Sequence, residues 1–209
     1  MNTRIKAIAY DLDGVVVNSL GNHYLAIQAV LSRCGISTPP IEKMNEWWYG
    51  PYEDRLIEMG VNLSLEETRQ IYNQTLIGKV FPLFPKFSQV ACRLNAQQIL
   101  LFIVTATFQL ENVTKILSDN KILDQFTDIR YGHDDKKIFL RELLETHDLY
   151  PDQMIFVGDT KRDMLNGVLA GVLPVGFDGG FGGIKSLIEA GAKHIITNHE
   201  QIFSLLESY

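Results

Sequence analysis

The sequence predicts an α/β fold, a doubly wound parallel sheet with a helical domain inserted near its N-terminal end. Two observations predict it. Short apolar runs alternate with amphipathic segments along most of the chain, and one long interval contains helix-like patterns without a convincing strand. Continuous apolar runs of this length suit strands that are buried on both faces of a parallel sheet. A strand followed by a helix, repeated along the chain, is typical of a doubly wound sheet.

Four apolar runs are expected to form the strands, namely Ile5–Tyr10, Ile99–Val104, Met154–Val157 and Val172–Phe177. The segments between or after them have helical character, namely Leu110–Leu117, Ile138–Thr146, Met164–Ala170, Ile184–Ala190 and Gln201–Leu206. Ligands of open α/β sheets bind outside the carboxyl ends of the strands. The residues that follow each apolar run are therefore the first candidates for a functional site.

The strand-free interval lies between the first two apolar runs. Its helix-like patterns are His23–Arg33, Tyr52–Met59 and Leu65–Ile77. Pro82 and Pro85 follow, and proline disfavours the continuation of a helix. We therefore expect residues 1–17 and 83–209 to form the α/β core domain, and residues 18–82 to form a separate helical domain.

Composition and charge exclude several classes of protein. Of the 209 residues 46% are hydrophobic and 21% charged, close to the average of globular proteins. The longest strongly apolar run, Ile99–Val104, is too short to span a bilayer, and the N-terminus lacks the build of a secretion signal, so we expect a cytoplasmic protein. The net charge of −6 argues against broad nucleic-acid binding but allows a small phosphorylated ligand at a local positive site.

Acidic and hydroxyl side chains stand directly after the expected strands. Asp11 and Asp13 follow the first run, Thr105 the second, and Asp159 and Asp163 the third. Taken singly, each has an ordinary structural explanation as a turn residue or a helix cap. Taken together, they bring oxygen ligands to one edge of the sheet, and Mg²⁺ prefers carboxylates together with waters and substrate phosphate. We therefore expect a Mg²⁺ site there.

A pair of lysines opens the helix that precedes the third of these strands. Lys136 and Lys137 stand where the helix dipole disfavours cations, which indicates a nearby phosphate or a crowded set of carboxylates. Either lysine could supply the charge. We favour Lys136, because Phe139, Leu140 and Leu144 follow it at core-facing helical spacings.

As a set, these residues resemble the motifs of the haloacid dehalogenase superfamily of phosphohydrolases, over nearly the whole chain. Tyr10–Ser19 looks like the first motif, Ile103–Thr107 the second, one of the two lysines the third, and Gly158–Asp163 the fourth. The third motif departs from the family pattern, because no proline follows the lysine. The resemblance implies a Rossmann-like core with a helical cap at residues 18–82, and the tail resembles that of the phosphoglycolate-phosphatase-like branch.

The resemblance also implies roles for the motif residues. Asp11 would attack phosphorus and carry an aspartyl phosphate, and Asp13 would protonate the leaving oxygen and then activate water. Thr105, the backbone of Ala106, and Lys136 would hold the phosphate oxygens.

The implied ligands of Mg²⁺ are the carboxylates of Asp11 and Asp159 and the backbone carbonyl of Asp13, with Asp163 beside them. The presence of Asp13 distinguishes the chain from the dehalogenases of the same fold.

Two further segments lie outside these motifs. Arg55, with an aromatic residue such as Trp48, is expected to close over the substrate, although the aromatic residues around it also suit the core of the cap. The glycine-rich stretch Gly176–Gly183 lacks the pattern of a nucleotide-binding loop and is expected to be a flexible loop at the rim.

The function expected from the sequence is a Mg²⁺-dependent phosphatase acting on a small phosphorylated metabolite, with the chain a monomer or a homodimer. Two alternatives remain open. A phosphomutase would return the phosphoryl group to a second hydroxyl of a sugar phosphate, and a binding protein would keep the fold without catalysis. The motifs do not identify the substrate.

Overall fold

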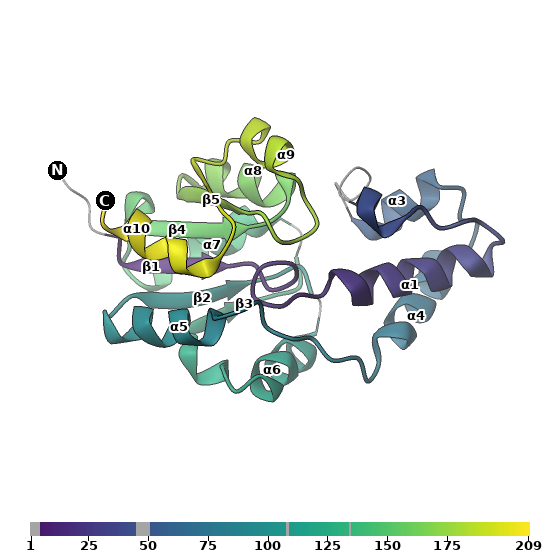
Figure 1. Ribbon diagram of the computed structural model, residues 1–209, viewed down its shortest axis with the longest axis horizontal. Coiled ribbons are helices and arrows are strands. Elements are labelled where there is room, and N and C mark those ends of the chain that lie inside the picture. Colours follow the sequence, from purple (N-terminus) through teal and green to yellow (C-terminus); the bar gives the residue numbers. More distant parts are fainter. Residues whose placement is uncertain (1–4, 45–50, 108, 134) are drawn as a thin grey trace.

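A computed structural model describes residues 5–44, 51–107, 109–133 and 135–209 and shows one parallel sheet of six strands (Figure 1). Along the sheet the strand order is β3-β2-β1-β4-β5-β6. The bounds are β1 Ala7–Tyr10, β2 Leu100–Val104, β3 Asp128–Arg130, β4 Met154–Gly158, β5 Leu173–Phe177 and β6 His194–Ile196. The four predicted strands are confirmed. The two edge strands β3 and β6 were not predicted, since each has three residues and lacks a continuous buried run.

The register of the central strands brings their carboxyl ends to one level. Tyr10, the last residue of β1, is paired with Ile103 of β2 on one side and with Val157 of β4 on the other. The residues that follow these strands therefore emerge at the same edge of the sheet, as expected for an open α/β sheet.

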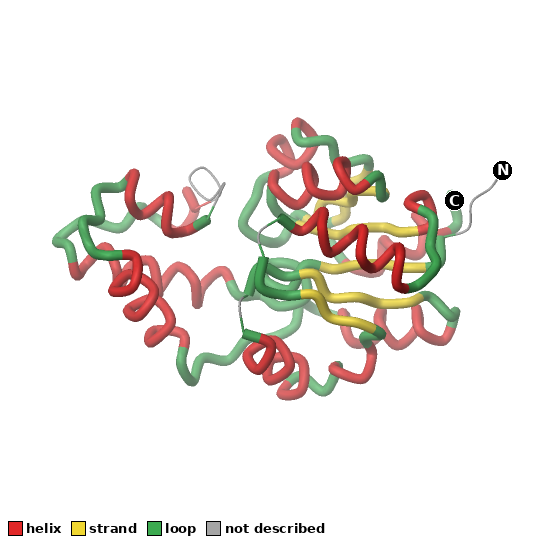
Figure 2. The backbone as a smooth tube through the Cα atoms, turned by 180° about the vertical axis from the view of Figure 1, so that it is seen from behind, coloured by secondary structure: helices red, strands yellow, loops and turns green. Residues whose placement is uncertain are grey.

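Helices cover both faces of the sheet (Figures 1 and 2). Side chains of α5, α6 and α10 pack in the hydrophobic cluster that contains Ile8 and Tyr10 of β1, and side chains of α7 and α8 pack in the cluster that contains Ala7 and Ala9. Successive residues of β1 thus point to opposite, equally buried faces. The bounds are α5 Phe87–Ala96, α6 Leu110–Asp119, α7 Lys136–Thr146, α8 Lys161–Ala170, α9 Ile184–Glu189 and α10 Ile202–Leu206. The described residues also form short 3₁₀ helices, namely η1 Ile41–Lys43, η2 Leu123–Gln125, η3 Pro151–Gln153 and η4 His199–Gln201.

The segment between β1 and α5 stands beyond the carboxyl ends of the strands (Figure 1). Its helices are α1 Leu20–Arg33, α3 Tyr52–Glu58 and α4 Leu65–Leu76, and its described residues contain no strand. They bury a hydrophobic cluster of their own, in which Ile27 and Leu31 of α1 meet Leu56 of α3 and Tyr72 of α4. We propose to treat residues 18–82 as the cap domain, and residues 1–17 and 83–209 as the core domain.

Two adjacent connectors join the proposed cap to the core. The Asn18 N–H donates to the Pro82 carbonyl at 2.8 Å, and the Phe84 N–H donates to the Val16 carbonyl at 3.1 Å. The chain therefore enters and leaves the cap at the same place. Among the described residues, no helix has both the length and the apolar character needed to cross a membrane.

A buried histidine contacts the chain just before the first of these connectors. His199 is 1% exposed, its ring stacks on Phe177 at 4.5 Å between centroids, and its Nε2 lies 2.9 Å from the Val15 carbonyl oxygen. Burial lowers the pKa of His199 to about 4, partly opposed by the bond to Val15. The ring is therefore neutral in the folded protein at neutral pH, and Nε2 donates to Val15.

We expect acid to weaken the fold through this histidine. In the unfolded chain its pKa returns to 6.5, so the unfolded state binds a proton that the folded state refuses. The contribution of this group to the free energy of unfolding should fall as the pH drops from 6.5 towards 4, by up to roughly 3 kcal/mol. Urea unfolding of the unaltered protein and of His199→Gln, which can still donate to Val15, at pH 7.5 and pH 5 isolates this contribution from that of the carboxylates. The unaltered protein should lose stability relative to the variant at pH 5, and the same difference between the two proteins at both pH values would contradict the prediction.

Candidate active site

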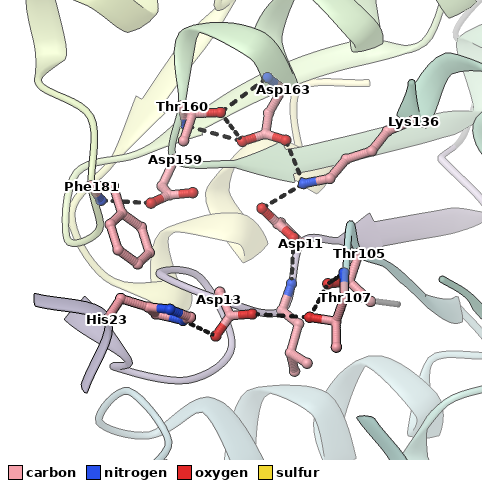
Figure 3. A network of polar contacts seen from close by, with 11 residues as sticks. Asp11, Asp13, His23, Thr105, Thr107, Lys136, Asp159, Thr160, Asp163 and Phe181 are labelled. Carbon is pink, nitrogen blue, oxygen red and sulfur yellow. Dashed lines mark hydrogen bonds and ion pairs between the residues drawn. The ribbon is translucent and has the colours of Figure 1, made fainter. Parts of the chain in front are cut away.

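Asp11 and Lys136 form a buried ion pair at the end of the central strand. The Asp11 backbone N–H donates to the Val157 carbonyl, which extends the β1–β4 pairing by one residue and fixes the start of the loop. One carboxylate oxygen, Oδ1, accepts the Leu12 N–H at 2.8 Å, and the other, Oδ2, lies 2.6 Å from Lys136 Nζ (Figure 3). Both residues are 6% exposed. A carboxylate that follows a strand and an ammonium group in the first turn of a helix therefore form an ion pair that is shielded from solvent.

Lys136 also holds a second carboxylate, that of Asp163. Its Nζ lies 2.7 Å from Asp163 Oδ1, and the Asp163 Oδ2 accepts the Thr160 N–H at 3.0 Å. Thr160 Oγ1 in turn accepts the Asp163 N–H, so the two residues form a capping box that starts α8. Asp163 is thus held by both of its oxygens, one at the helix start and one at the lysine.

Asp159 lies beside this pair and is held by the glycine-rich loop. The Phe181 N–H donates to Asp159 Oδ2 at 2.6 Å, and the Gly182 N–H donates to the Asp159 carbonyl. A Cβ at Gly180 would lie 2.0 Å from Asp159 Oδ2, so a side chain does not fit there. Gly14 approaches the same oxygen, because a Cβ there would lie 2.2 Å away. The expectation of a flexible rim loop missed this contact.

Three buried carboxylates therefore lie near the ammonium group of Lys136 in this part of the site. Ligand oxygens of Asp11, Asp159 and Asp163 all lie within 4.8 Å of one another. Burial, followed by repulsion from the neighbouring aspartates, raises the pKa of Asp159 well above its usual value. Burial also raises the pKa of Asp11 to about 7, although Lys136 counteracts it. Despite its own burial, Lys136 has a raised pKa because Asp11 and Asp163 surround it.

This group of carboxylates fits a divalent cation with oxygen ligands. Asp159 Oδ1 is a buried oxygen with no hydrogen-bond partner among the described residues, and buried polar atoms seldom lack one. Three negative charges around a single lysine leave an excess of negative charge. Mg²⁺ would complete both the ligand set and the charge balance.

Asp13 belongs to a different group, although it is two residues from Asp11. Its Oδ1 lies 3.0 Å from His23 Nε2, and its Oδ2 lies 3.4 Å from Thr107 Oγ1 (Figure 3). Its side chain is not a member of the acidic cluster, so any ligand atom from Asp13 has to come from the backbone, as the resemblance implies. Burial tends to raise the pKa of Asp13, but His23 lowers it below its usual value.

The loop after β2 completes the edge nearest Asp13. Thr105 is buried, and its N–H donates to the Arg130 carbonyl of β3. Its Oγ1 accepts the Thr107 N–H at 3.2 Å. Ala106 is half-buried in the same loop. Thr107 of the same loop contacts Asp13, so the loop reaches the first motif.

The two lysines differ in position, and the structure separates them. Lys136 lies in the acidic cluster, whereas Lys137 pairs with Asp135 and is about one-third exposed. The lysine that the sequence favours, Lys136, is therefore the one that contacts the acidic cluster.

Arg55 is not part of the network in Figure 3. It lies in α3 and forms an ion pair with Glu58 of the same helix. Trp48, its proposed aromatic companion, lies outside the described residues. A substrate contact by Arg55 stays a prediction.

Sequence reasoning missed His23 and Phe181. The spacing of the histidines does not indicate that His23 would reach Asp13 from the first helix after the motif. The sequence did contain a signal for Phe181, because a large apolar residue among glycines indicates that the loop packs against the protein at that residue.

Comparisons with known proteins agree with the resemblance seen in the sequence motifs. A sequence model described as haloacid dehalogenase-like hydrolase matches residues 8–176. A phosphoglycolate phosphatase of Mannheimia succiniciproducens is 29% identical over 201 residues, covering 87% of this chain and 89% of that protein. One from Haemophilus influenzae is 25% identical, covering 99% and 100%. A haloacid dehalogenase-like hydrolase structure from Streptococcus pneumoniae superposes with a TM-score of 0.84 at 25% identity, covering 98% and 99%.

The crowding of carboxylates predicts that one substitution in the site stabilises the fold. Asp159→Asn keeps an acceptor for the Phe181 N–H and removes one of three buried negative charges. In excess chelator at pH 8 we expect the free energy of unfolding to rise by about 1 kcal/mol or more, because a buried like charge is removed. Urea unfolding measures it. Asp152→Asn, at an exposed carboxylate, should change nothing, and a less stable Asp159→Asn protein would show that the cluster is not under repulsion.

Proposed function

Because the chain belongs to the haloacid dehalogenase-like hydrolases, we propose that it is a phosphatase that cleaves a small phosphate monoester through a phosphate carried on Asp11. The observation that carries the proposal is the division between the two carboxylates of the first motif. Asp11 faces Lys136 and the acidic cluster, whereas Asp13 faces His23 and Thr107. Two identical groups in different surroundings can perform different chemistry.

In the first step, the Asp11 carboxylate attacks phosphorus and the bond from phosphorus to the leaving oxygen breaks. Its other oxygen keeps the Leu12 N–H, which fixes the direction of attack. Asp13 gives a proton to the leaving oxygen. His23 holds the pKa of Asp13 low in the free protein, and a dianionic phosphate beside Asp13 would raise it and favour the protonated form.

In the second step, water is the nucleophile. Asp13, now a carboxylate, accepts a proton from water as the oxygen bonds to phosphorus, and the bond to Asp11 breaks. Inorganic phosphate leaves, and both aspartates return to their starting states. Lys136 and the Thr105 hydroxyl would hold the phosphate oxygens in both steps.

We further propose Mg²⁺ as the cofactor, held by the carboxylates of Asp11 and Asp159 and the backbone carbonyl of Asp13, with Asp163 beside them. When bound, it would supply positive charge against the repulsion between the phosphate and the acidic cluster. The positions that would hold it come from the loops after β1 and β4 and from the first turn of α8.

Phosphoglycolate is the first substrate to test, because two relatives at 29% and 25% identity carry the name phosphoglycolate phosphatase. The class that we propose is wider, namely small phosphate monoesters, since the core recognises the phosphoryl group and the cap contacts the rest. A panel of phosphorylated metabolites, assayed for phosphate release with purified protein, tests the proposal. Isomerised sugar phosphate as product would show a mutase instead.

The two aspartates should fail in different ways when changed. Asp11→Asn removes the nucleophile, so turnover should fall to background. Asp13→Asn removes the acid and base, a loss of about 10²–10⁴ in rate, but keeps the nucleophile. With an aryl phosphate, whose leaving group needs little protonation, the Asp13 variant should accumulate phosphate on Asp11. Mass spectrometry detects the adduct, and hydroxylamine should remove it. Normal turnover by Asp11→Asn would exclude the mechanism.

Activity should depend on a small divalent cation. Mg²⁺ should support turnover and Ca²⁺ should not, because Ca²⁺ takes more and longer oxygen contacts and would loosen the alignment of attack. Phosphate release is measured in chelator, then after addition of each ion. Undiminished release in excess chelator would contradict the proposed site.

A further inference from the structure

A chain of hydrogen bonds leads from Asp13 out of the core and into the cap. His23 of α1 contacts Asp13 Oδ1 through Nε2 at 3.0 Å, and Tyr72 of α4 through Nδ1 at 2.5 Å. Tyr72 is 4% exposed, so its hydroxyl is out of water. Both links past Asp13 therefore belong to helices of the proposed cap.

The direction of each bond follows from what the end groups can do. A carboxylate only accepts, so the bond to Asp13 requires a proton on His23 Nε2. Burial raises the pKa of Tyr72 well above its usual value, so the phenol keeps its proton. The Tyr72 O–H can then donate to Nδ1 of a ring whose Nε2–H donates to Asp13. Tyr72 and Asp13 thus fix the same orientation of the His23 ring.

This arrangement makes the two oxygens of Asp13 unequal. Oδ1 is occupied as the acceptor of the His23 N–H, in the carboxylate and in the carboxylic acid alike. We therefore assign the proton that Asp13 transfers to Oδ2, because the Thr107 hydroxyl, which donates to the carboxylate there, can turn and accept. That oxygen faces Thr107 Oγ1 of the β2 loop, on the side of the second motif (Figure 3).

Aromatic packing holds the chain in place. Tyr52 of α3 stacks on Tyr72 with 3.9 Å between ring centroids and 11° between planes. On the other side, the His23 ring meets Phe181 at 5.5 Å, edge to face. Phe181 is the residue whose N–H holds Asp159. The orientation of His23 therefore depends on three helices of the cap and on the loop that binds the acidic cluster.

We infer that Tyr72 is a positioning residue that acts through His23 to aim one oxygen of Asp13 at the leaving group. The inference rests on the proposed function, because it requires Asp13 to be the acid. It makes protonation of the leaving group depend on how α1 and α4 of the cap pack together. Tyr72 itself need not touch the substrate.

The dependence of rate on the leaving group tests this inference. Tyr72→Phe removes the hydroxyl and keeps the ring in its stack. Over a series of phosphate monoesters, kcat/KM for alkyl esters should fall on the order of 10-fold, part of the 10²–10⁴ that a positioned acid supplies. For esters of acidic phenols it should stay within about twofold, since these leaving groups need little protonation. Tyr24→Phe is the matched control, because the Tyr24 hydroxyl donates to the Pro39 carbonyl elsewhere in the cap. This variant should leave the dependence of kcat/KM on the leaving group unchanged.

A double-mutant cycle shows whether Tyr72 acts through His23. In a His23→Ala background, Tyr72→Phe should cost less than about twofold, because residues that act as a unit are not additive. The same loss in both backgrounds, or an equal loss for all leaving groups, would overturn the inference.

A second measurement needs no variant to be active. The ¹⁵N shifts of the imidazole in the unaltered protein, assigned with His23→Ala, should show a proton on Nε2 of His23. A neutral ring protonated on Nδ1 would overturn the inference. An unaltered protein that releases phosphate from no ester with Mg²⁺ would overturn the proposed function, and with it this role. The two failures are distinguishable, because the shifts report the hydrogen bonds without turnover.

Discussion

The electrostatic imbalance at the end of the central strands governs the rest of the site. Asp11, Asp159 and Asp163 share a buried space with one lysine, and burial together with the neighbouring carboxylates raises the pKa values of Asp11 and Asp159. The surrounding backbone responds at each residue. A strand extension fixes Asp11, a capping box fixes Asp163, and the glycine-rich loop gives an N–H to Asp159. Such a cluster is costly to fold, and the divalent cation that we propose would offset the repulsion.

Lys136 lies at a helix N-terminus, a position that the helix dipole makes unfavourable for a cation. Here the start of α7 lies against two carboxylates that more than offset this effect. The same departure made the lysine visible in the sequence. Its choice over Lys137 also followed from core spacing, because Leu140 and Leu144 face the sheet only if Lys136 turns towards the strand ends.

Much of the fold could be predicted from the sequence, because buried parallel strands leave long apolar runs and the site residues follow them directly. The short edge strands could not, since β3 and β6 are half-buried and are defined by their neighbours in the sheet. Helix α5 was not predicted, although Phe87, Val90 and Leu94 do recur at helical spacing after the connector. His23 escaped for another reason. Its contact with Asp13 joins the proposed cap to the core, and no local pattern encodes how the helices after β1 lie relative to the sheet.

The paired connectors have a consequence for how such a protein can diverge. Asn18 and Pro82 are hydrogen-bonded, so the chain enters and leaves the segment between them at one place. A segment inserted in this way can be lengthened, shortened or exchanged during evolution while the sheet keeps its register. His23 limits this freedom, because it contacts Asp13 from within the segment. Under the proposed mechanism, a replacement segment without a donor in the place of His23 would leave Asp11 in place and Asp13 less well oriented, so changes in substrate choice and in the rate of proton transfer would be selected together.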